Sequence, residues 1–224
     1  MMLQDARELI TATCARLGPD GLIVGTAGNL SIREGELLAI TPSGLPYEDL
    51  RPDLVAVVDL ATGEQVDGPL RPASELDLHL ATLRATGQAA VVHTHSPAAT
   101  AVASLVGVTA LPAVHYYIAL FGGPDVRVAD YATYGSAELA ANVERALTGP
   151  PPRRAALMAN HGSVVAGPDL ATAYTLALEL EWLCELYLRT RAAGEPRILP
   201  DGAIAEVAAK IAGYGQRAPG PKAT

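Results

Sequence analysis

Apolar residues at the start of the chain, among them Leu9, Ile10 and Leu17, recur at the three-to-four-residue spacing of a helix. This pattern predicts an amphipathic helix that ends near Gly18. Four later stretches between glycine and proline breakers also favour helix, and the last of them begins at Asp169, a residue type suited to N-capping. These stretches are residues 74–86, 97–106, 136–147 and 169–193.

Short runs rich in β-branched and aliphatic residues, bounded by glycine, proline or polar turns, predict strands. The runs cover residues 37–40, 54–59, 90–94, 109–114, 127–129 and 155–158. Strands and helices follow one another in a mixed order rather than as strict β-α-β units, and no internal repeat is present. The pattern therefore predicts a layered α/β fold in which helices cover both faces of a sheet of about six strands.

The composition is typical of a soluble globular protein. Half of the 224 residues are apolar, enough for the core of one domain, and the net charge of −8 disfavours nucleic acid or an anionic membrane as the main partner. Cys14 and Cys184 fall inside predicted helices, without the spacing of a disulfide framework. The most hydrophobic long segment, residues 171–188, carries three glutamates and is a poor membrane span. We therefore expect a cytoplasmic protein with reduced thiols.

Three histidines form a candidate metal site. His93 and His95 lie two apart in a predicted strand, so both rings point to the same face and can reach one ion. His161 follows another predicted strand at a glycine turn. Three imidazoles leave a position open on a tetrahedral ion, which is the arrangement of a catalytic site. His79 and His115 remain as competing ligands.

Glu75 is a candidate for proton transfer. Ser74 is positioned to cap the helix that follows, which places Glu75 in the first helical turn. A carboxylate is favoured there by the helix dipole alone, so the position has a purely structural explanation as well as a catalytic one. His79 lies four residues later on the same helix face, where a surface pair is the simpler account.

Two glycine turns, residues 25–29 and 41–44, supply backbone N–H groups and small polar side chains of the kind that bind anions. Neither turn matches a dinucleotide-binding or P-loop pattern. Lysine is confined to Lys210 and Lys222, near the end of the chain. Catalysis through a Schiff base needs a lysine in the active site, so any carbon–carbon cleavage by this chain would require a metal.

Taken together, these stretches resemble, in content and order, the class II sugar-phosphate aldolases of the class II aldolase/adducin family. Within that family the chain looks like the L-fuculose-1-phosphate aldolases. The resemblance covers nearly the whole chain, from the first helix to about residue 217. It is carried by Gly25-Thr26-Ala27-Gly28-Asn29, Thr41-Pro42-Ser43-Gly44, Ser74-Glu75, His93-Thr94-His95, His115-Tyr116, Tyr131-Ala132-Thr133-Tyr134-Gly135, His161-Gly162 and Tyr214-Gly215.

The resemblance implies a three-layer α/β/α fold with a central mixed or antiparallel sheet. It implies a single domain over residues 1–217, a disordered tail over residues 218–224, and a homotetramer with active sites at the subunit interfaces. Zinc, with cobalt or manganese as alternatives, would be held by three histidines and reached by one carboxylate. These metal ligands are His93, His95, His161 and Glu75.

The implied reaction is the reversible cleavage of a ketose 1-phosphate, similar to L-fuculose 1-phosphate, into dihydroxyacetone phosphate and a small aldehyde. Glu75 and Tyr116 would transfer protons, and Tyr116 and Tyr214 would reach in from the neighbouring subunit. The phosphorylated sugar would be gripped through its phosphate by turn residues. Those residues are Thr26, Gly28, Asn29, Ser43, Gly44 and Ser74.

The chain departs from the family pattern at a few positions. Ala73 stands where the pattern has a serine that helps to bind phosphate, and Tyr134 and Ile211 replace phenylalanines. The natural sugar therefore stays open. The alternatives are an L-ribulose-5-phosphate 4-epimerase, a methylthioribulose-1-phosphate dehydratase and a non-catalytic adducin-like scaffold. Glu75 in place of aspartate argues against the epimerase, and the intact metal histidines argue against the scaffold.

Overall fold

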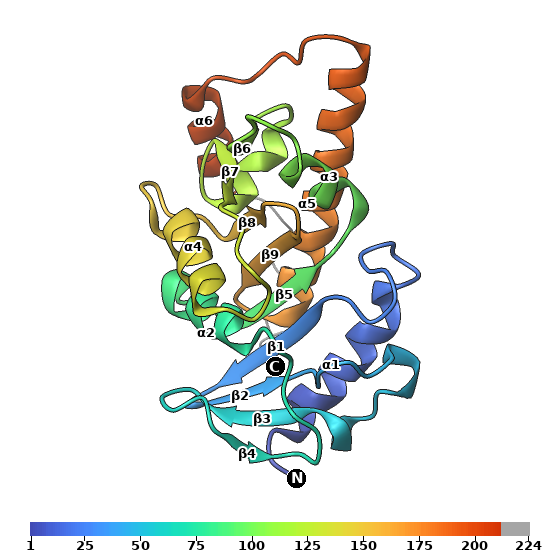
Figure 1. Ribbon diagram of the computed structural model, residues 1–224. Coiled ribbons are helices and arrows are strands. Elements are labelled where there is room, and N and C mark those ends of the chain that lie inside the picture. Colours follow the sequence, from blue (N-terminus) through green and yellow to red (C-terminus); the bar gives the residue numbers. More distant parts are fainter. Residues whose placement is uncertain (212–224) are drawn as a thin grey trace, which may run out of the picture.

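The chain folds around a mixed β-sheet in a computed structural model that describes residues 1–211 (Figure 1). Over these residues the sheet has nine strands in the order β4-β3-β2-β1-β5-β9-β8-β7-β6. Neighbouring strands are antiparallel, except that β7 and β8 run parallel. The strands are β1 (Asn29–Glu34), β2 (Leu37–Ile40), β3 (Ala56–Asp59), β4 (Gln65–Asp67), β5 (Ala90–Thr94), β6 (Ala110–Pro112), β7 (Asp125–Ala129), β8 (Ala155–Met158) and β9 (Gly162–Gly167).

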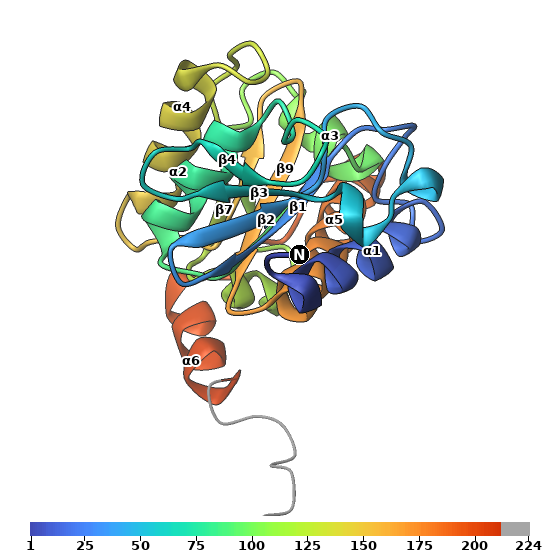
Figure 2. The same cartoon turned by 90° about the horizontal axis from the view of Figure 1, so that it is seen from below.

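Helices cover both faces of this sheet, as Figures 1 and 2 show from two directions. One face carries α1 (Gln4–Leu17), α3 (Pro97–Ala103) and α5 (Leu170–Ala193). The opposite face carries α2 (Leu76–Thr86) and α4 (Ala137–Thr148). Beside these layers, α6 (Asp201–Ile211) packs on the short 3₁₀ helix η3 (Tyr116–Phe121); two further 3₁₀ turns are η1 (Tyr47–Asp49) and η2 (Pro52–Leu54). The three-layer α/β/α fold with a mixed sheet, expected from the sequence, is confirmed.

The central strand β5 shows how the sequence builds two cores. Successive side chains of a strand point to opposite faces, so Val92 packs into the cluster that contains α1, α3 and α5, whereas Val91 packs into the cluster that contains α2 and α4. Both residues are fully buried. The apolar run that predicted this strand therefore reflects burial on both faces, and His93 continues the row of side chains that faces α2.

The sequence predicted several elements well. The strands expected over residues 37–40, 90–94 and 155–158 have the same bounds in the structure, and Asp169 caps α5 by accepting a hydrogen bond from the backbone N–H of Thr172 at 2.7 Å. The estimate of about six strands was wrong, because β1, β4 and β9 were not anticipated. β1 alternates apolar and polar residues and β4 is a short exposed edge strand, so neither has a continuous apolar run; the short apolar run of β9, between Gly162 and Gly167, was assigned to no element.

The start of α2 also differs from the prediction. Ser74 does not cap the helix; the N-cap residue is Glu75. A backbone turn, in which Leu76 N–H bonds to the carbonyl of Ala73 at 3.1 Å, precedes the helix and delays its first residue. Glu75 therefore lies at the entrance of the helix rather than in its first turn.

Other expectations concern the cysteines, membrane segments and the chain end. Cys14 in α1 and Cys184 in α5 are buried and free. Among residues 1–211, no helix is long and apolar enough to cross a membrane. Tyr214, the tail predicted over residues 218–224 and the predicted domain end at residue 217 lie outside the described residues.

Candidate metal centre and active-site cavity

Four side chains from three different parts of the fold converge at one point. His93 and His95 come from the end of β5, His161 from the turn between β8 and β9, and Glu75 from the start of α2. One donor atom from each of the four residues lies within 4.8 Å of the others. The sequence therefore named all four members of this cluster, and neither His79 nor His115 belongs to it.

A tight hairpin positions His161. Met158 pairs with Gly162 across the hairpin, and the intervening turn includes Asn160 in the left-handed conformation, at φ 53°. Gly162 is needed at the start of β9, because a Cβ there would lie 2.2 Å from the carbonyl oxygen of Thr94. This close approach holds the hairpin against the end of β5 and brings His161 beside His95.

The ring of His93 is oriented by the backbone of β9. Its Nδ1 lies 2.8 Å from the carbonyl oxygen of Ser163, which can only accept, so Nδ1 carries the proton and Nε2 is left as a lone-pair donor. That Nε2 lies 3.0 Å from Nε2 of His95 and 3.0 Å from Oε2 of Glu75. His161 completes the ring, with its Nε2 3.1 Å from Nε2 of His95 and 3.2 Å from Oε1 of Glu75.

Electrostatics in the cluster favour an ionised Glu75 carboxylate and a neutral His95 imidazole. Burial by itself raises the pKa of Glu75, but the adjacent imidazoles of His93 and His161 and the Nδ2 donor of Asn29 outweigh it and hold the pKa well below its ordinary value. Burial, followed by the neighbouring His93 and His161, lowers the pKa of His95 to about 4. At neutral pH, Glu75 therefore presents a negative charge and His95 a lone pair to a common centre.

This donor set fits a divalent metal ion. Two ligands at about 2.0–2.1 Å from a tetrahedral zinc ion lie about 3.3–3.4 Å apart, close to the 3.0–3.2 Å that separate the donor atoms here. Nε2 of His95 faces Nε2 of His93 and of His161. A cation between these nitrogens would offset the repulsion between their lone pairs. Oε1 of Glu75 is also buried without a hydrogen-bond donor in the described structure, which a cation would satisfy.

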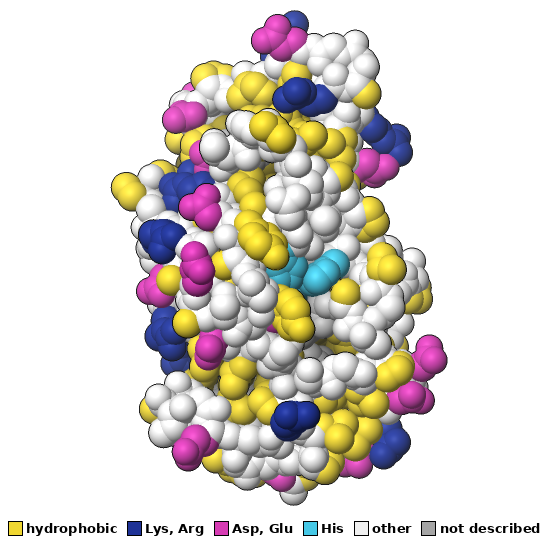
Figure 3. All heavy atoms as spheres, in the orientation of Figure 1, with side chains coloured by type: hydrophobic (Ala, Val, Ile, Leu, Met, Phe, Trp, Pro, Cys, Tyr) yellow, Lys and Arg dark blue, Asp and Glu magenta, His cyan; other side chains and the backbone are white. Residues whose placement is uncertain are grey.

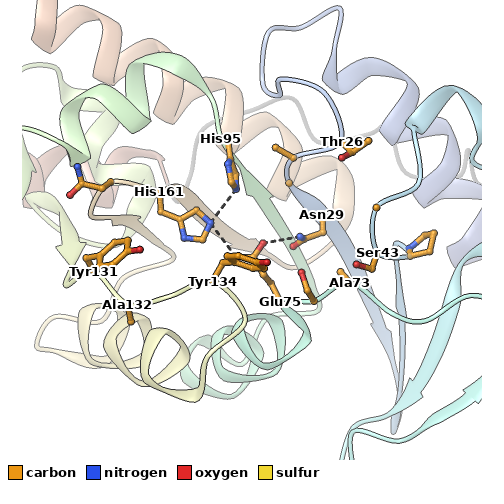
Figure 4. Close-up of a pocket in the computed structure, with 16 residues that line it drawn as sticks. Thr26, Asn29, Ser43, Ala73, Glu75, His95, Tyr131, Ala132, Tyr134 and His161 are labelled. Atoms are coloured by element: carbon orange, nitrogen blue, oxygen red, sulfur yellow. Dashed lines mark hydrogen bonds and ion pairs between the residues drawn. The ribbon is translucent and has the colours of Figure 1, made fainter.

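A cavity of about 520 Å³ opens onto the cluster. Figure 3 shows histidine side chains at the bottom of a hollow in the middle of one face of the molecule. In Figure 4, Thr26, Ser43 and Ala73 lie on one side of the cluster, and Tyr131 with Ala132 lies on the other. No lysine or arginine is among the described residues that line the cavity, so an anion would be bound here by uncharged donors and the metal.

The polar end of the cavity is built from the two glycine turns and the segment before α2. Backbone hydrogen bonds join these segments: Ser43 N–H donates to the carbonyl of Arg71 at 3.1 Å, and Ala73 N–H donates to that of Thr41 at 2.9 Å. All six predicted phosphate-binding residues line the cavity, together with Ala73 in the position where the family pattern has serine. The six are Thr26, Gly28, Asn29, Ser43, Gly44 and Ser74.

Asn29 has partners that the sequence did not suggest. Its Nδ2 donates to Oε2 of Glu75 at 3.1 Å, and its Oδ1 lies 2.5 Å from Nε2 of His79. His79 is fully buried, with its Nδ1 2.6 Å from the hydroxyl of Ser31, and burial lowers its pKa to about 3. The interpretation of Glu75 and His79 as a surface pair was therefore wrong.

Tyr116, one of the two predicted catalytic tyrosines, lies outside this cavity. Tyr116 belongs to η3, is 45% exposed and is not among the described residues that line the cavity. Its ring packs on His115, with 4.3 Å between ring centroids, and the ring of His115 also contacts Trp182. Tyr214 lies outside the described residues. The described structure therefore does not place Tyr116 in the cavity of its own chain.

Tyr131, Tyr134 and Asn160 line the cavity but were not singled out as functional by their residue type. Gly135 explains the position of the tyrosine loop, because a Cβ there would lie 2.7 Å from the carbonyl oxygen of Ser74. The only signal in the sequence was that these residues occur within the stretches that carry the family resemblance.

Comparison with known proteins decides the family. The family model described as "Class II Aldolase and Adducin N-terminal domain" matches residues 8–188. The chain belongs to the class II aldolase and adducin family. It is therefore an enzyme related to class II aldolases, which are lyases, and its Glu75-histidine cluster is of the kind that binds the divalent metal of such aldolases.

Several relatives match almost end to end. "5-deoxy-D-ribulose 1-phosphate aldolase" of Bacillus thuringiensis serovar kurstaki is 44% identical over 220 residues, covering 97% of this chain and 100% of the relative. "L-fuculose phosphate aldolase" of Escherichia coli K12 is 40% identical, covering 95% and 96%. A solved structure of "L-fuculose 1-phosphate aldolase" superposes with a TM-score of 0.88 at 37% identity, covering 95% of this chain and 98% of that one.

Proposed function

We propose that this class II aldolase reversibly cleaves a ketose 1-phosphate into dihydroxyacetone phosphate and a small aldehyde. The observation that carries the proposal is the position of the Glu75-histidine cluster between two ends of one cavity (Figure 4). One end offers the hydroxyls and backbone amides suited to a phosphate, and the other offers Tyr131 and Ala132, while Tyr134 is drawn over the cluster in Figure 4. A ketose phosphate that spans these ends would bring its middle carbons to the cluster.

His93, His95 and His161 would hold the metal, for which we propose zinc, with cobalt and manganese as alternatives. When bound, the ion would stabilise the negative charge that develops on the substrate oxygens. The described structure supports this route over a Schiff base, because Lys210, the one lysine within residues 1–211, does not line the cavity.

Glu75 would move the proton at C3 of the substrate. When the C3–C4 bond breaks, its electron pair stays on C3, and a proton from the Glu75 carboxyl group completes dihydroxyacetone phosphate. At rest, the adjacent His93 and His161 imidazoles and the Nδ2 donor of Asn29 keep the pKa of this carboxyl group low. Substrate that separates the carboxylate from these neighbours would raise its pKa and allow it to hold the proton.

Tyr116 would accept the proton of the C4 hydroxyl as C4 becomes the aldehyde carbon. We propose that it acts in the cavity of a neighbouring subunit of a homotetramer, and that Tyr214 reaches the same site. Support for Tyr116 comes from its exposed position on η3, outside the cavity of its own chain. An exposed tyrosine beside Tyr117 and Trp182 is the kind of aromatic surface found in subunit interfaces.

For the substrate, we favour a five-carbon 5-deoxy ketose 1-phosphate over L-fuculose 1-phosphate. The support is the name of the Bacillus thuringiensis relative, together with "5-methylthioribulose-1-phosphate/5-deoxyribulose-1-phosphate aldolase" of Rhodospirillum rubrum, which is 44% identical over 208 residues and covers 91% of this chain and 90% of the relative. Cleavage between C3 and C4 of such a substrate leaves a two-carbon aldehyde. The ring of Tyr131 provides an apolar border for this end (Figure 4).

The test is an aldol assay with metal-loaded enzyme. Dihydroxyacetone phosphate is offered with acetaldehyde, methylthioacetaldehyde or lactaldehyde, and unphosphorylated dihydroxyacetone serves as the control for phosphate recognition. We expect condensation only with the phosphate ester and the highest kcat/KM with acetaldehyde or methylthioacetaldehyde. The reverse reaction is followed by NMR: clean epimerisation of a ketose 5-phosphate, or loss of water from the ketose 1-phosphate, would replace the aldolase proposal with the epimerase or dehydratase alternative.

A further inference from the structure

A chain of buried polar groups lies behind the Glu75 carboxylate and extends away from the cavity. It runs from Ser31 through His79 and Asn29 to Glu75, over contacts of 2.6, 2.5 and 3.1 Å. Ser31 and His79 are fully buried, and Asn29 and Glu75 are 6% and 5% exposed. In such surroundings each polar group needs its partner, because an unpaired donor or acceptor would have no water to replace it.

The fold brings these residues together through two periodicities. Asn29 and Ser31 lie two apart on β1 and pair with His93 and Val91 of β5, so both point to the face covered by α2. His79 lies one helical turn beyond Glu75 on α2. The imidazole of His79 therefore bridges two neighbours on the strand, one of which contacts Glu75.

Carboxylate chemistry fixes the direction of every hydrogen bond in the chain. Oε2 of Glu75 can only accept, so the group of Asn29 that faces it is the Nδ2 amide and the group that faces His79 is Oδ1. Oδ1 also can only accept, so His79 carries its proton on Nε2. Nδ1 of His79 is then a lone pair that accepts from the hydroxyl of Ser31.

We propose that His79 is a positioning residue. Its Nε2–H donates to Oδ1 of Asn29 and so keeps Nδ2 of that amide directed at Glu75. This contact holds the Glu75 carboxylate in its position beside the three histidines. The proposal rests on the aldolase function proposed above. The His79 side chain neither lines the cavity nor belongs to the metal cluster, and it reaches the Glu75 carboxylate only through Asn29. Loss of its donor would leave Oδ1 of Asn29 unpaired and the amide free to turn its oxygen towards Glu75, where two acceptors would repel.

A pair of amide variants separates this role from simple core packing. In His79→Gln the side-chain nitrogen can stand near the position of Nε2 and donate to Asn29, whereas in His79→Asn the shorter amide can reach only the Ser31 side. Both replace a ring by a neutral amide. Thr82→Val is the matched control on α2, because Thr82 is fully buried and its hydroxyl has no partner in the described structure.

We expect kcat of the metal-loaded enzyme to fall by about 10–100-fold in His79→Asn and in His79→Leu, and by less than about fivefold in His79→Gln and Thr82→Val. Among these variants, kcat should depend on whether a hydrogen-bond donor to Asn29 is present, and should not correlate with the melting temperature. Equal losses in the Gln and Asn variants, or activities that simply track stability, would reduce His79 to a core residue.

A second measurement does not depend on turnover. Nitrogen-15 NMR of the metal-free wild-type protein should show His79 as the tautomer with a protonated Nε2 and a bare Nδ1. A proton on Nδ1 instead would overturn the proposal. An enzyme that fails the aldol assay but shows the expected tautomer would disprove the proposed function and leave the hydrogen-bond chain intact, so the two failures are distinguishable.

Discussion

Gly28 lies against the backbone of His93, and a Cβ on Gly28 would be 2.7 Å from the His93 carbonyl oxygen. The same glycine has a φ of +85°, in the left-handed region that other residues rarely adopt. This close approach fixes the position of the turn before β1 relative to the end of β5. It therefore also fixes the polar end of the cavity relative to the metal cluster.

Replacement of Gly28 by alanine should therefore disturb the site as well as the fold. Gly25→Ala is the matched control, because Gly25 has a φ of +63° but nothing within 4 Å of its Cβ position. Both variants carry the backbone strain of about 1 kcal/mol, and only Gly28→Ala adds the clash. We expect Gly28→Ala to unfold at a lower denaturant midpoint than Gly25→Ala and to retain less metal; equal behaviour would mean that the turn relaxes away from β5.

The metal site gives the second prediction. The purified protein should bind about one zinc-like ion per subunit, because three imidazoles with a carboxylate nearby suit borderline divalent metals. Elemental analysis should show loss of this ion from a His93→Ala, His95→Ala double variant. His115→Ala removes a histidine outside the cluster and should keep its metal; full occupancy in the double variant would rule out the proposed site.

How much of this site the sequence could predict depends on how local each signal is. His93 and His95 were predictable because a strand of period two places them on one face, and His161 because it follows a strand at a turn. The contacts of Asn29 could not be read in the same way: its partners Glu75 and His79 lie 46 and 50 residues away, and they meet it only through the register of β1 with β5. β1 itself was not anticipated.

The misreading of His79 has a related cause. An i, i+4 pair of acidic and basic residues on a helix is most often a solvated surface pair, and helical spacing alone says nothing about which face is covered. Only the sheet beneath α2 determines that His79 is buried. Packing between distant segments, rather than local pattern, decided every feature of the site that the sequence left open.

The third prediction concerns Glu75→Gln, which keeps the size of the side chain and removes the titrating group. We expect turnover to fall by about a hundredfold or more with little change in melting temperature, the usual scale for a general acid–base residue. Glu185→Gln on the exposed side of α5 is the control and should be neutral, because its ion pair with Arg189 is a surface pair. Near-normal turnover of Glu75→Gln would return Glu75 to a structural role at the helix start.

The fourth prediction is a pH dependence of stability. Burial lowers the pKa of His79 from 6.5 to about 3, so below pH 6.5 the unfolded chain binds a proton that the folded chain does not. The free energy of unfolding should therefore fall as the pH falls from 7 to 5, by about 2 kcal/mol from this residue. His79→Gln lacks this titration, so its urea midpoint should fall less than that of the wild type when both metal-free proteins are compared at the two pH values. Parallel losses would show that His79 titrates normally in the folded protein.

The last prediction tests whether the site is shared between subunits. Tyr116 is exposed and lies outside its own chain's cavity, whereas Glu75 is buried at the cavity floor. If they meet only across an interface, Glu75→Gln and Tyr116→Phe are each nearly inactive alone but regain activity when co-assembled into mixed oligomers. With random equal mixing, a site receives an intact Glu75 from one subunit half of the time. It receives an intact Tyr116 from the neighbouring subunit half of the time, so about a quarter of sites are whole.

Within a single-chain site no rescue is possible, because every chain carries one defect. Mixed oligomers, verified by mass spectrometry, that stay at the activity of the single variants would exclude the shared site.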